Sequence, residues 1–228
     1  MRGIDFVQIP TTLLAQVDAS VGGKTAIDLP AGKNLVGAFH QPLAVLADTE
    51  LLQTLPAREY SAGFAEIIKA ALLADVEFFH WLETNKAALV QRDDAQLAEA
   101  IFRSCEIKAR FVAADERESG VRALLNLGHT FAHALEKATG FEQLLHGEAV
   151  AIGLVRALAL SEQHCALDPS LRPRLARLLQ EFSLPTALPD QIHPEAVLEA
   201  MRLDKKHSAG NWRLVVLPAI GIIVDISV

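Results

Sequence analysis

The sequence predicts a mainly α-helical protein with short β-strands at both ends. Downstream of Pro56, apolar residues recur at helical spacing. Before Pro56 the chain is rich in Gly, Pro and Thr, which favours loops and short strands, and the last residues again have the composition of strands. We therefore expect a strand and loop segment over residues 1–56 and a helical domain over residues 57–228.

Each element follows from the apolar spacing and from the residues that break it. Before the helical domain we expect strands at 4–9, 24–29 and 43–47. One or two further strands are expected within 213–225, and Asp93 or Asp94 is a candidate cap for the third helix. The helices are expected at about 57–83, 86–92, 94–115, 122–138, 147–164, 170–182 and 194–203.

The composition excludes several classes of protein. Hydrophobic residues make up 51% of the chain and charged residues 21%, as in ordinary globular proteins, and the net charge of −7 argues against general nucleic-acid binding. Cys105 and Cys165 form no CxxC pair, which argues against a thiolate zinc site or a disulfide framework. The longest apolar run, 149–160, contains Arg156 and is too short to span a bilayer, and the N-terminus lacks the apolar core of a signal peptide. We expect a cytoplasmic protein that binds no membrane.

Three histidines lie close together in an apolar part of the sequence. His129 and His133 are four residues apart, so on a helix they share one face and could chelate a metal ion. No HExxH motif is present, so the metalloprotease helix is excluded. A pair of hydrogen-bonded, partly buried histidines is the alternative explanation of this spacing. His146 stands at an expected helix start, where backbone amides also attract anions, and strengthens the case for a site.

Glu66 and Lys69 are the only charged residues in the apolar run 61–74. They are three residues apart, so a surface ion pair is one interpretation. Their apolar neighbours leave little room for a solvated face, and a buried charge is costly unless it is paired or bound to a metal. A carboxylate together with neutral imidazoles suits zinc in a catalytic site. A metalloenzyme is therefore the leading hypothesis.

The segment 18–34 has the glycine and lysine content of an anion-binding loop. Gly23 precedes Lys24, and Gly32 precedes Lys33. The segment is not a P-loop, since Asp18 occupies the place of its first glycine, and glycines here can also serve only to make turns. Two lysines that each follow a glycine favour an anion site.

Two further groups of polar residues are ambiguous from spacing alone. On a single helix, Arg122 and Asn126 would share a face with His129 and His133, and that face could line a cleft or contact water. The run of Asp, Lys and Lys at 204–206 is more often a solvated cluster than a site.

These segments together resemble 3-dehydroquinate synthase, and they occur in that family's order over nearly the whole chain. The matching stretches are QIPTTLLAQVDASVGGKTAIDLPAGKNLVGAF, GFAEIIKAALL, ADERESGVRALLNLGHTFAHALE, LHGEAVAIG and LDKK. The resemblance covers the C-terminal two-thirds of that enzyme and implies the fold of its C-terminal domain. In the family a nucleotide-binding α/β domain of roughly a hundred residues precedes the strand at 4–9. We expect that this domain, and a final helical segment after Val228, are absent from the chain.

The resemblance implies a lyase of the shikimate pathway, which supplies aromatic amino acids. Its substrate is the sugar-acid phosphate 3-deoxy-D-arabino-heptulosonate 7-phosphate, and its products are 3-dehydroquinate and phosphate. The reaction combines transient oxidation by NAD, phosphate elimination, reduction and an aldol closure, with zinc or cobalt as a Lewis acid. Because the nucleotide-binding domain is expected to be absent, we expect weak turnover or none from this chain alone.

The resemblance also implies a role for individual residues. The metal ligands would be Glu66, His129 and His146, in place of the pair of histidines that spacing alone favours. The catalytic residues would be Asp18 and Lys69, near the metal, and His133, near the phosphate. Substrate-binding residues would be Arg2, Lys24, Asn34, Lys108, Arg122, Asn126 and one of Lys205 and Lys206. NAD contacts would be Thr11, Thr12, Lys24, Lys33, Leu51, Leu52, Gln53 and Thr54.

Within the substrate group, Arg122 and Lys108 would hold the carboxylate, for which a planar guanidinium is well suited. Arg2 would reach the phosphate of a neighbouring subunit, which implies a homodimer.

Three other functions compete with this one. Another sugar phosphate cyclase would keep the metal ligands but would have no substrate carboxylate to bind, and Arg122 with Lys108 favours the acidic substrate. A polyol dehydrogenase of related fold would release reduced nicotinamide. A non-catalytic remnant would bind a metal or a partner without turnover.

Overall fold

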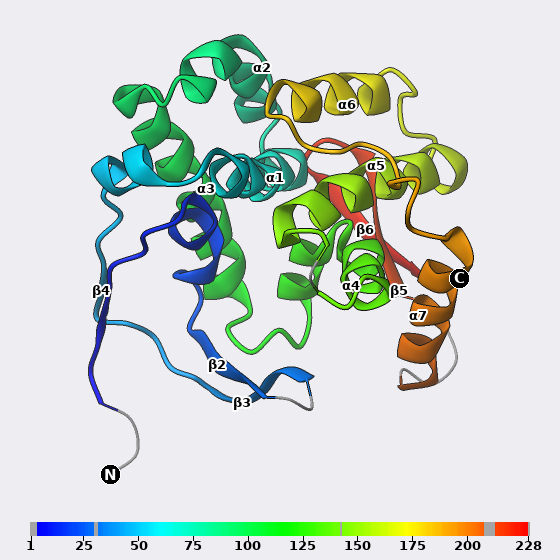
Figure 1. Ribbon diagram of the computed structural model, residues 1–228, viewed down its shortest axis with the longest axis horizontal. Helices are drawn as coiled ribbons and strands as arrows, with labels where there is room; N and C mark the ends of the chain where they lie inside the picture. The colour runs from blue at the N-terminus through cyan, green and yellow to red at the C-terminus, as the bar shows by residue number, and fades with distance from the viewer. Residues whose placement is uncertain (1–3, 30–31, 142, 208–212, 228) are drawn as a thin grey trace.

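The computed structural model describes residues 4–29, 32–141, 143–207 and 213–227. Over these ranges the chain forms a helical body with three two-stranded sheets at its periphery (Figure 1). The predicted mainly α-helical fold with short strands at both ends is confirmed. None of the described helices combines the length and apolar composition that a membrane crossing requires.

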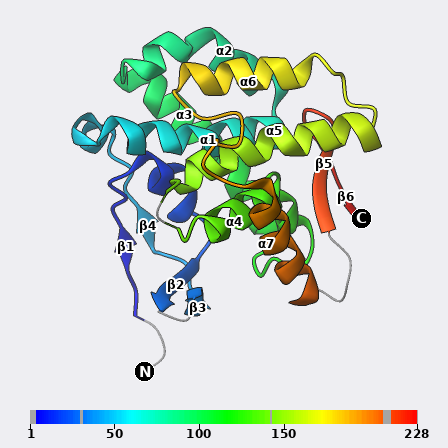
Figure 2. The ribbon, with the colours of Figure 1, turned by 45° about the vertical axis from the view of Figure 1, so that its right-hand side comes forward.

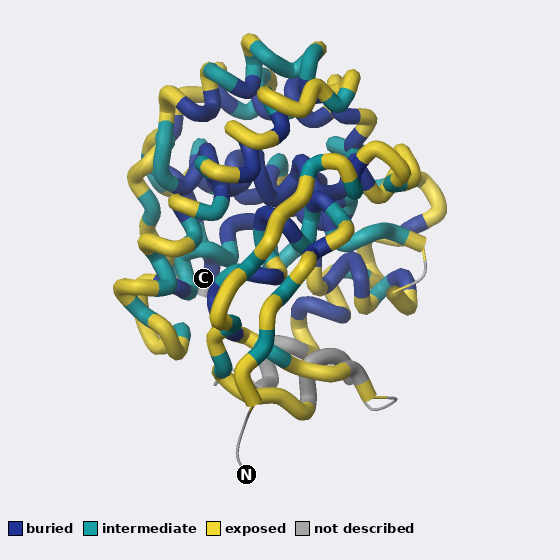
Figure 3. Tube along the Cα trace, turned by 90° about the vertical axis from the view of Figure 1, so that its left-hand side faces the viewer, coloured by how far each residue is buried: buried dark blue, intermediate teal, exposed yellow. Residues whose placement is uncertain are grey.

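The N-terminal segment contributes two of the three sheets. Strands β1 (Val7–Gln8) and β4 (Ala44–Val45) pair in parallel, and they run along the outside of the helical body (Figure 3). Strands β2 (Lys24–Leu29) and β3 (Gly32–Phe39) form an antiparallel hairpin that extends away from the helices (Figure 2). The sequence predicted no strand at β3, because its two glycines weaken the strand pattern.

Two short helical turns connect these strands to each other and to the body. A π-helical turn, η1 (Ala15–Ala19), follows β1, and it begins where the Thr12 hydroxyl accepts a hydrogen bond from the backbone N–H of Ala15. A 3₁₀ helix, η2 (Thr49–Thr54), follows β4 and leads into the first long helix. Single π-turns are frequent at functional sites, and η1 carries Asp18.

Helices α1 (Ala57–Ala74) and α2 (Val76–Val90) are separated at Asp75, so the predicted helices 57–83 and 86–92 are wrong in their boundaries. Asp75 has an extended backbone, and its carboxylate accepts a hydrogen bond of 2.9 Å from the backbone N–H of Phe78. It therefore caps α2. The apolar pattern runs through this break without a Gly or Pro, and only the Asp itself marks it.

Replacing Asp75 with alanine is expected to lower the free energy of unfolding by about 1 kcal/mol, because the cap of α2 is lost. Asp75→Asn is the matched control, since asparagine caps equally well but cannot form the ion pair of 2.9 Å with Arg103. Urea denaturation of both variants measures the difference. An equal loss in both would assign the effect to the ion pair and would contradict the expectation.

Helix α3 (Asp94–Ala114) is capped by Asp93, whose carboxylate accepts from the backbone N–H of Gln96 at 3.0 Å. The predicted helix 122–138 is wrong. The structure has a 3₁₀ helix, η3 (Val121–Asn126), and a separate helix, α4 (His129–Ala138).

Gly128 makes the break between η3 and α4. It has φ +77°, and a Cβ there would lie 2.8 Å from the backbone nitrogen of Leu154. The single face that would join Arg122 and Asn126 to His129 therefore does not exist.

The remaining elements are α5 (His146–His164), α6 (Leu171–Glu181), α7 (Pro194–His207) and the C-terminal hairpin of β5 (Arg213–Ala219) and β6 (Ile222–Ser227). Helix α5 packs against α1, α4 and β5. The crossing of α1 and α5 is very close, since a Cβ at Gly147 would lie 1.9 Å from the carbonyl oxygen of Ala62. This crossing brings residues 66 and 146 of the two helices toward each other.

Helix α1 forms the centre of the core. Every residue from 62 to 73 is buried, including the two charged ones, so this part of the helix has no solvated face. The Phe64 ring stacks on Phe182 with 3.9 Å between ring centroids, and the Tyr60 ring meets Phe64 edge-on. The apolar surroundings of Glu66 and Lys69 therefore place that pair inside the protein.

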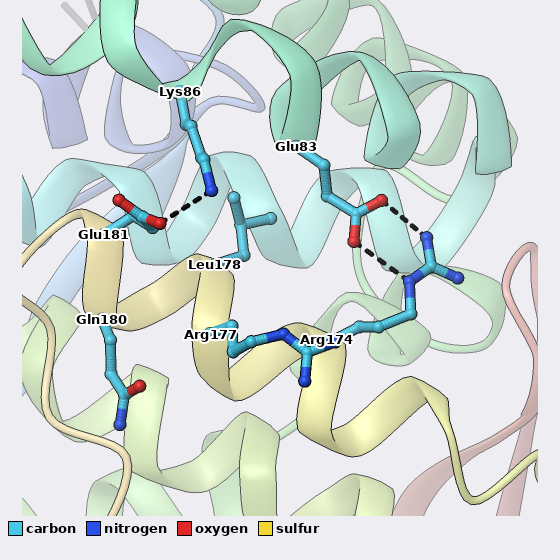
Figure 4. A pocket seen from close by; sticks show the side chains of 7 residues that line it. All are labelled: Glu83, Lys86, Arg174, Arg177, Leu178, Gln180 and Glu181. Carbon is cyan, nitrogen blue, oxygen red and sulfur yellow. Dashed lines mark hydrogen bonds and ion pairs between the residues drawn. The ribbon is translucent and has the colours of Figure 1, made fainter.

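Helix α6 lies beside α2, and a surface cavity of about 300 Å³ separates some of their side chains (Figure 4). Arg174 binds both carboxylate oxygens of Glu83, at 3.0 and 2.6 Å, and Lys86 pairs with Glu181 at 2.7 Å. Partly exposed pairs of this kind contribute about 1 kcal/mol or less each. They hold α6 against α2, and none of the residues that line this cavity is among those predicted to be functional.

Candidate active site

The carboxylate of Glu66 and the imidazoles of His129 and His146 meet in the interior. They come from α1, α4 and α5, so three separate helices supply them. Glu66 Oε1 lies 3.5 Å from Nε2 of His129 and 3.4 Å from Nε2 of His146. Each of the three offers one possible metal-ligand atom, and these atoms lie within 4.8 Å of one another. Among the residues that the structure describes, no other three His, Cys, Asp or Glu side chains form such a group.

The burial and ionisation of Glu66 are those expected of a metal ligand. Its side chain is 2% exposed, Oε2 forms an ion pair with Lys69, and Oε1 faces Nε2 of the two histidines. Burial by itself would raise the pKa of Glu66, but Lys69 and the two histidines outweigh burial and hold that pKa well below its usual value. The carboxylate is therefore an anion with free lone pairs, which is what a metal ligand requires.

The two histidines differ in protonation. Burial, with Lys69 as the second cause, lowers the pKa of His129 to about 3, so this imidazole is neutral. Burial would also lower the pKa of His146, but hydrogen bonds to Glu136 and Glu66 outweigh it and raise the pKa to about 9. A metal that binds here would displace the His146 proton.

The orientation of His129 is fixed by the break before α4. Its Nδ1 lies 3.2 Å from the carbonyl oxygen of Leu127, which can only accept a hydrogen bond. Nδ1 therefore carries the proton, and the lone pair of Nε2 points to the shared centre. The His133 ring meets the His129 ring edge-on, with 5.5 Å between centroids. His133 thus lies next to the three-residue group but outside it.

A larger cavity of about 580 Å³ lies between η1, α3, η3 and the β2–β3 hairpin. It is lined by four of the predicted residues: Asp18, Lys24, Lys108 and Arg122. A narrow space next to Glu66 is lined by Asp18, Lys108, Glu66 and Lys69, and it shares Asp18 and Lys108 with the larger cavity. The structure therefore brings three of the predicted substrate residues, Lys24, Lys108 and Arg122, into one cavity together with Asp18.

The charges in this cavity are tightly held. Lys108 donates to the backbone carbonyl and to the carboxylate of Asp18, both at 2.6 Å. The Arg122 side chain is buried, and its Nη2 donates to the carbonyl oxygen of Gly22 at 2.8 Å. Burial, together with the nearby charges of Arg122 and Lys108, lowers the pKa of Lys24 to about 8. Cations outnumber anions, so the cavity favours an anionic ligand.

Glu118 is a site residue that sequence reasoning missed. One of its carboxylate oxygens forms an ion pair with Lys24, and the other accepts from the Asn126 side chain at 3.2 Å. Glu118 has φ +56° in a loop that Asp115 holds by accepting hydrogen bonds from three backbone N–H groups. In the sequence, Glu118 is only an acidic residue near Arg122, and this position does not indicate a contact with Lys24.

Several predicted residues lie outside the described part of the chain. This holds for Arg2 as a whole and for the side chains of four residues, whose backbones lie on β3 and α7: Lys33, Asn34, Lys205 and Lys206.

The predicted cofactor residues lie on the N-terminal segment, and their role stays a prediction. Thr11 is exposed, whereas the Leu52 side chain is fully buried in the core. Gln53 donates to the carbonyl oxygen of Arg92 and to Asp94, both at 3.2 Å. Since Leu52 is buried, the exposed members of η2 are the better candidates for a ligand contact.

Comparison with known families identifies the chain. A family profile described as 3-dehydroquinate synthase C-terminal matches residues 63–207. The chain belongs to the 3-dehydroquinate synthase family. The family's N-terminal profile matches residues 1–62, so the two profiles meet inside α1.

Curated 3-dehydroquinate synthases are close in sequence. That of Xylella fastidiosa strain 9a5c is 56% identical over 226 residues, which cover 97% of this chain and 57% of that protein. The one from Xanthomonas oryzae pv. oryzae strain PXO99A is also 56% identical and is 61% covered. The chain thus spans less than two thirds of the length of these relatives.

Two solved structures of sugar phosphate cyclases are similar in fold. A 2-epi-5-epi-valiolone synthase from Streptomyces hygroscopicus subsp. jinggangensis 5008, with NAD+ and Zn2+ bound, has a TM-score of 0.89 at 30% identity; the match covers 100% of this chain and 63% of that one. A 2-deoxy-scyllo-inosose synthase complexed with carbaglucose-6-phosphate, NAD+ and Co2+ has a TM-score of 0.89 at 26% identity, with 100% and 65% covered.

Proposed function

We propose that this chain carries the metal and substrate site of a 3-dehydroquinate synthase. The reaction converts 3-deoxy-D-arabino-heptulosonate 7-phosphate to 3-dehydroquinate and phosphate. The observation that carries the proposal is the group of Glu66, His129 and His146 beside a cavity lined by cations. The close sequence relatives are curated under this activity, which supports the assignment.

The metal is proposed to be zinc or cobalt, the ions bound by the two similar structures. Glu66, His129 and His146 would hold it, and when bound it would supply Lewis-acid polarisation of substrate hydroxyl groups. Lys69 keeps Glu66 ionised through their ion pair, and Asp18, which lines a narrow space with Glu66, would contact a hydroxyl group near the metal.

The substrate is proposed to lie in the cavity with its two anionic groups apart. Arg122 and Lys108 would bind the carboxylate, because a buried guanidinium offers a planar pair of donors for it. The phosphate would be bound by Lys24, Asn126 and His133. Arg2 of a neighbouring subunit, Asn34 and one of Lys205 and Lys206 complete the proposed phosphate group.

NAD is proposed as the cofactor, since both similar structures contain NAD+. When bound it would accept and return one hydride, and the surface of η2 with Thr11, Thr12, Lys24 and Lys33 would contact it from this chain. A cytoplasmic homodimer is part of the same proposal.

The experiment that tests this function measures metal content and ligand binding on the purified chain. We expect about one zinc per chain and binding of the heptulosonate phosphate that is at least tenfold tighter than binding of glucose 6-phosphate, which lacks a carboxylate. Arg122→Ala should remove that preference. No zinc, or equal affinity for both sugar phosphates, would contradict the proposal. Net formation of reduced nicotinamide would instead indicate a polyol dehydrogenase.

The phosphate affinity of the chain should fall as pH rises above about 8. The pKa of Lys24 is lowered to about 8, so this side chain is a cation below that pH and becomes neutral above it, well before an ordinary lysine would. Titration of inorganic phosphate by calorimetry between pH 7 and 9.5 measures the effect. Lys24→Arg is the matched control, since arginine stays charged throughout. A flat profile in the unmodified chain would contradict the prediction.

A further inference from the structure

We infer that Glu136 is a positioning residue that orients His146 toward the metal. The inference rests on the proposed function, in which His146 is a metal ligand. Glu136 is 5% exposed on α4, and its Oε1 lies 3.3 Å from Nδ1 of His146 on α5. This contact joins a buried carboxylate to the ring nitrogen that faces away from Glu66.

The geometry assigns each nitrogen of His146 one role. Nε2 lies 3.4 Å from Oε1 of Glu66, so it points to the shared centre. Nδ1 must then carry the proton, and Glu136 accepts a hydrogen bond from it. A histidine that binds a metal commonly donates its other N–H to a carboxylate or carbonyl oxygen, which fixes the ring and increases its basicity.

His146 needs this support more than His129 does. The His129 side chain is 12% exposed, and its Nδ1 faces the backbone carbonyl of Leu127, which no substitution removes. The His146 side chain is 30% exposed, so fewer neighbours restrict its ring. Loss of the Glu136 contact would let the ring of His146 rotate or change tautomer.

Helix α4 carries Glu136 on the same face as His129 and His133. Positions 129, 133 and 136 are four and three residues apart, so they share one face of the helix. The same helix thus supplies one ligand directly and orients a second ligand on α5. Burial of the carboxylate would destabilise the fold if it served no partner, which agrees with a paired role.

The test measures the zinc affinity of the metal-free chain by competition with a coloured chelator. Glu136→Ala is expected to raise the Kd for zinc by about 10- to 100-fold. Glu136→Gln keeps an oxygen acceptor of the same shape, so its Kd should rise only a few-fold. The visible absorption of bound Co2+ should change in the alanine variant and stay close to the parent in the glutamine variant.

Glu83→Ala is the control, since it removes a partly buried carboxylate between α2 and α6. Its zinc Kd should be unchanged, and its thermal stability is the reference for that of the Glu136 variants. If Glu136→Ala fails to fold, Glu136→Leu fills the same volume without an acceptor and replaces it in the titration.

The possible results separate this inference from the proposed function. Zinc binding by the parent chain with an unchanged Kd in Glu136→Ala would overturn the inference and leave the metal site intact. An equal loss in the alanine and glutamine variants would also overturn it. Absence of zinc binding in the parent chain would overturn the proposed function itself.

Discussion

Replacing His129 with alanine is expected to weaken zinc binding by about a thousandfold, since one of three protein ligands is lost from a site whose total binding free energy is about 10 kcal/mol or more. His129 is the best placed of the three for this test. It is neutral, its Nε2 faces Glu66, and it is the first residue of α4. Competition titration of the metal-free chain measures the change.

His133→Ala is the matched control for this prediction. His133 is on the same helix and in ring contact with His129, but it is outside the three-residue donor group. Its substitution should alter the zinc Kd by only a few-fold. If both variants lost zinc equally, the metal would be held by the two histidines of α4, as spacing alone suggested, and the three-helix site would be wrong.

Replacing Gly147 with alanine is expected to lower the free energy of unfolding by about 3 kcal/mol or more. The added Cβ would lie 1.9 Å from the carbonyl oxygen of Ala62, and a backbone atom cannot yield as a flexible side chain can. Helices α1 and α5 would have to separate at their crossing. Urea denaturation measures the loss, and zinc titration should show a weaker site because the helices carry Glu66 and His146.

Gly140→Ala is the control for Gly147. Gly140 has φ +64°, so alanine there is strained, but nothing lies within 4 Å of the added Cβ. Its cost should be about 1 kcal/mol, which is the backbone contribution alone. A similar cost at both positions would show that the α1–α5 crossing can relax, contrary to the prediction.

The helical fold could be predicted because apolar spacing is a local property. Errors arose where a break has no local marker in the apolar pattern. Asp75 interrupts a continuous apolar run, and its capping role depends on the hydrogen bond to Phe78. Gly128 adopts φ +77° where α5 passes close to it, and this single glycine was the only local sign that the helix 122–138 is interrupted.

Spacing in the sequence predicts the candidate site less completely than it predicts the fold. Spacing could pair His129 with His133, because a helix relates them, but it could not join Glu66 to His146 across two helices. Only the family resemblance suggested that grouping, which the structure now brings together. Glu118 and Glu136 were missed because their partners, Lys24 and His146, lie on other elements.

The all-round burial of α1 has a consequence for how such a protein can change its substrate. Glu66 and Lys69 share a helix with the central packing residues, so alterations near the metal disturb folding as well as chemistry. Lys24 and the rest of the β2–β3 hairpin lie at the periphery, where Ile27 and Val36 are exposed. Substitutions in the hairpin are therefore expected to change which ligand the cavity accepts, while Glu66 and Lys69 stay unchanged.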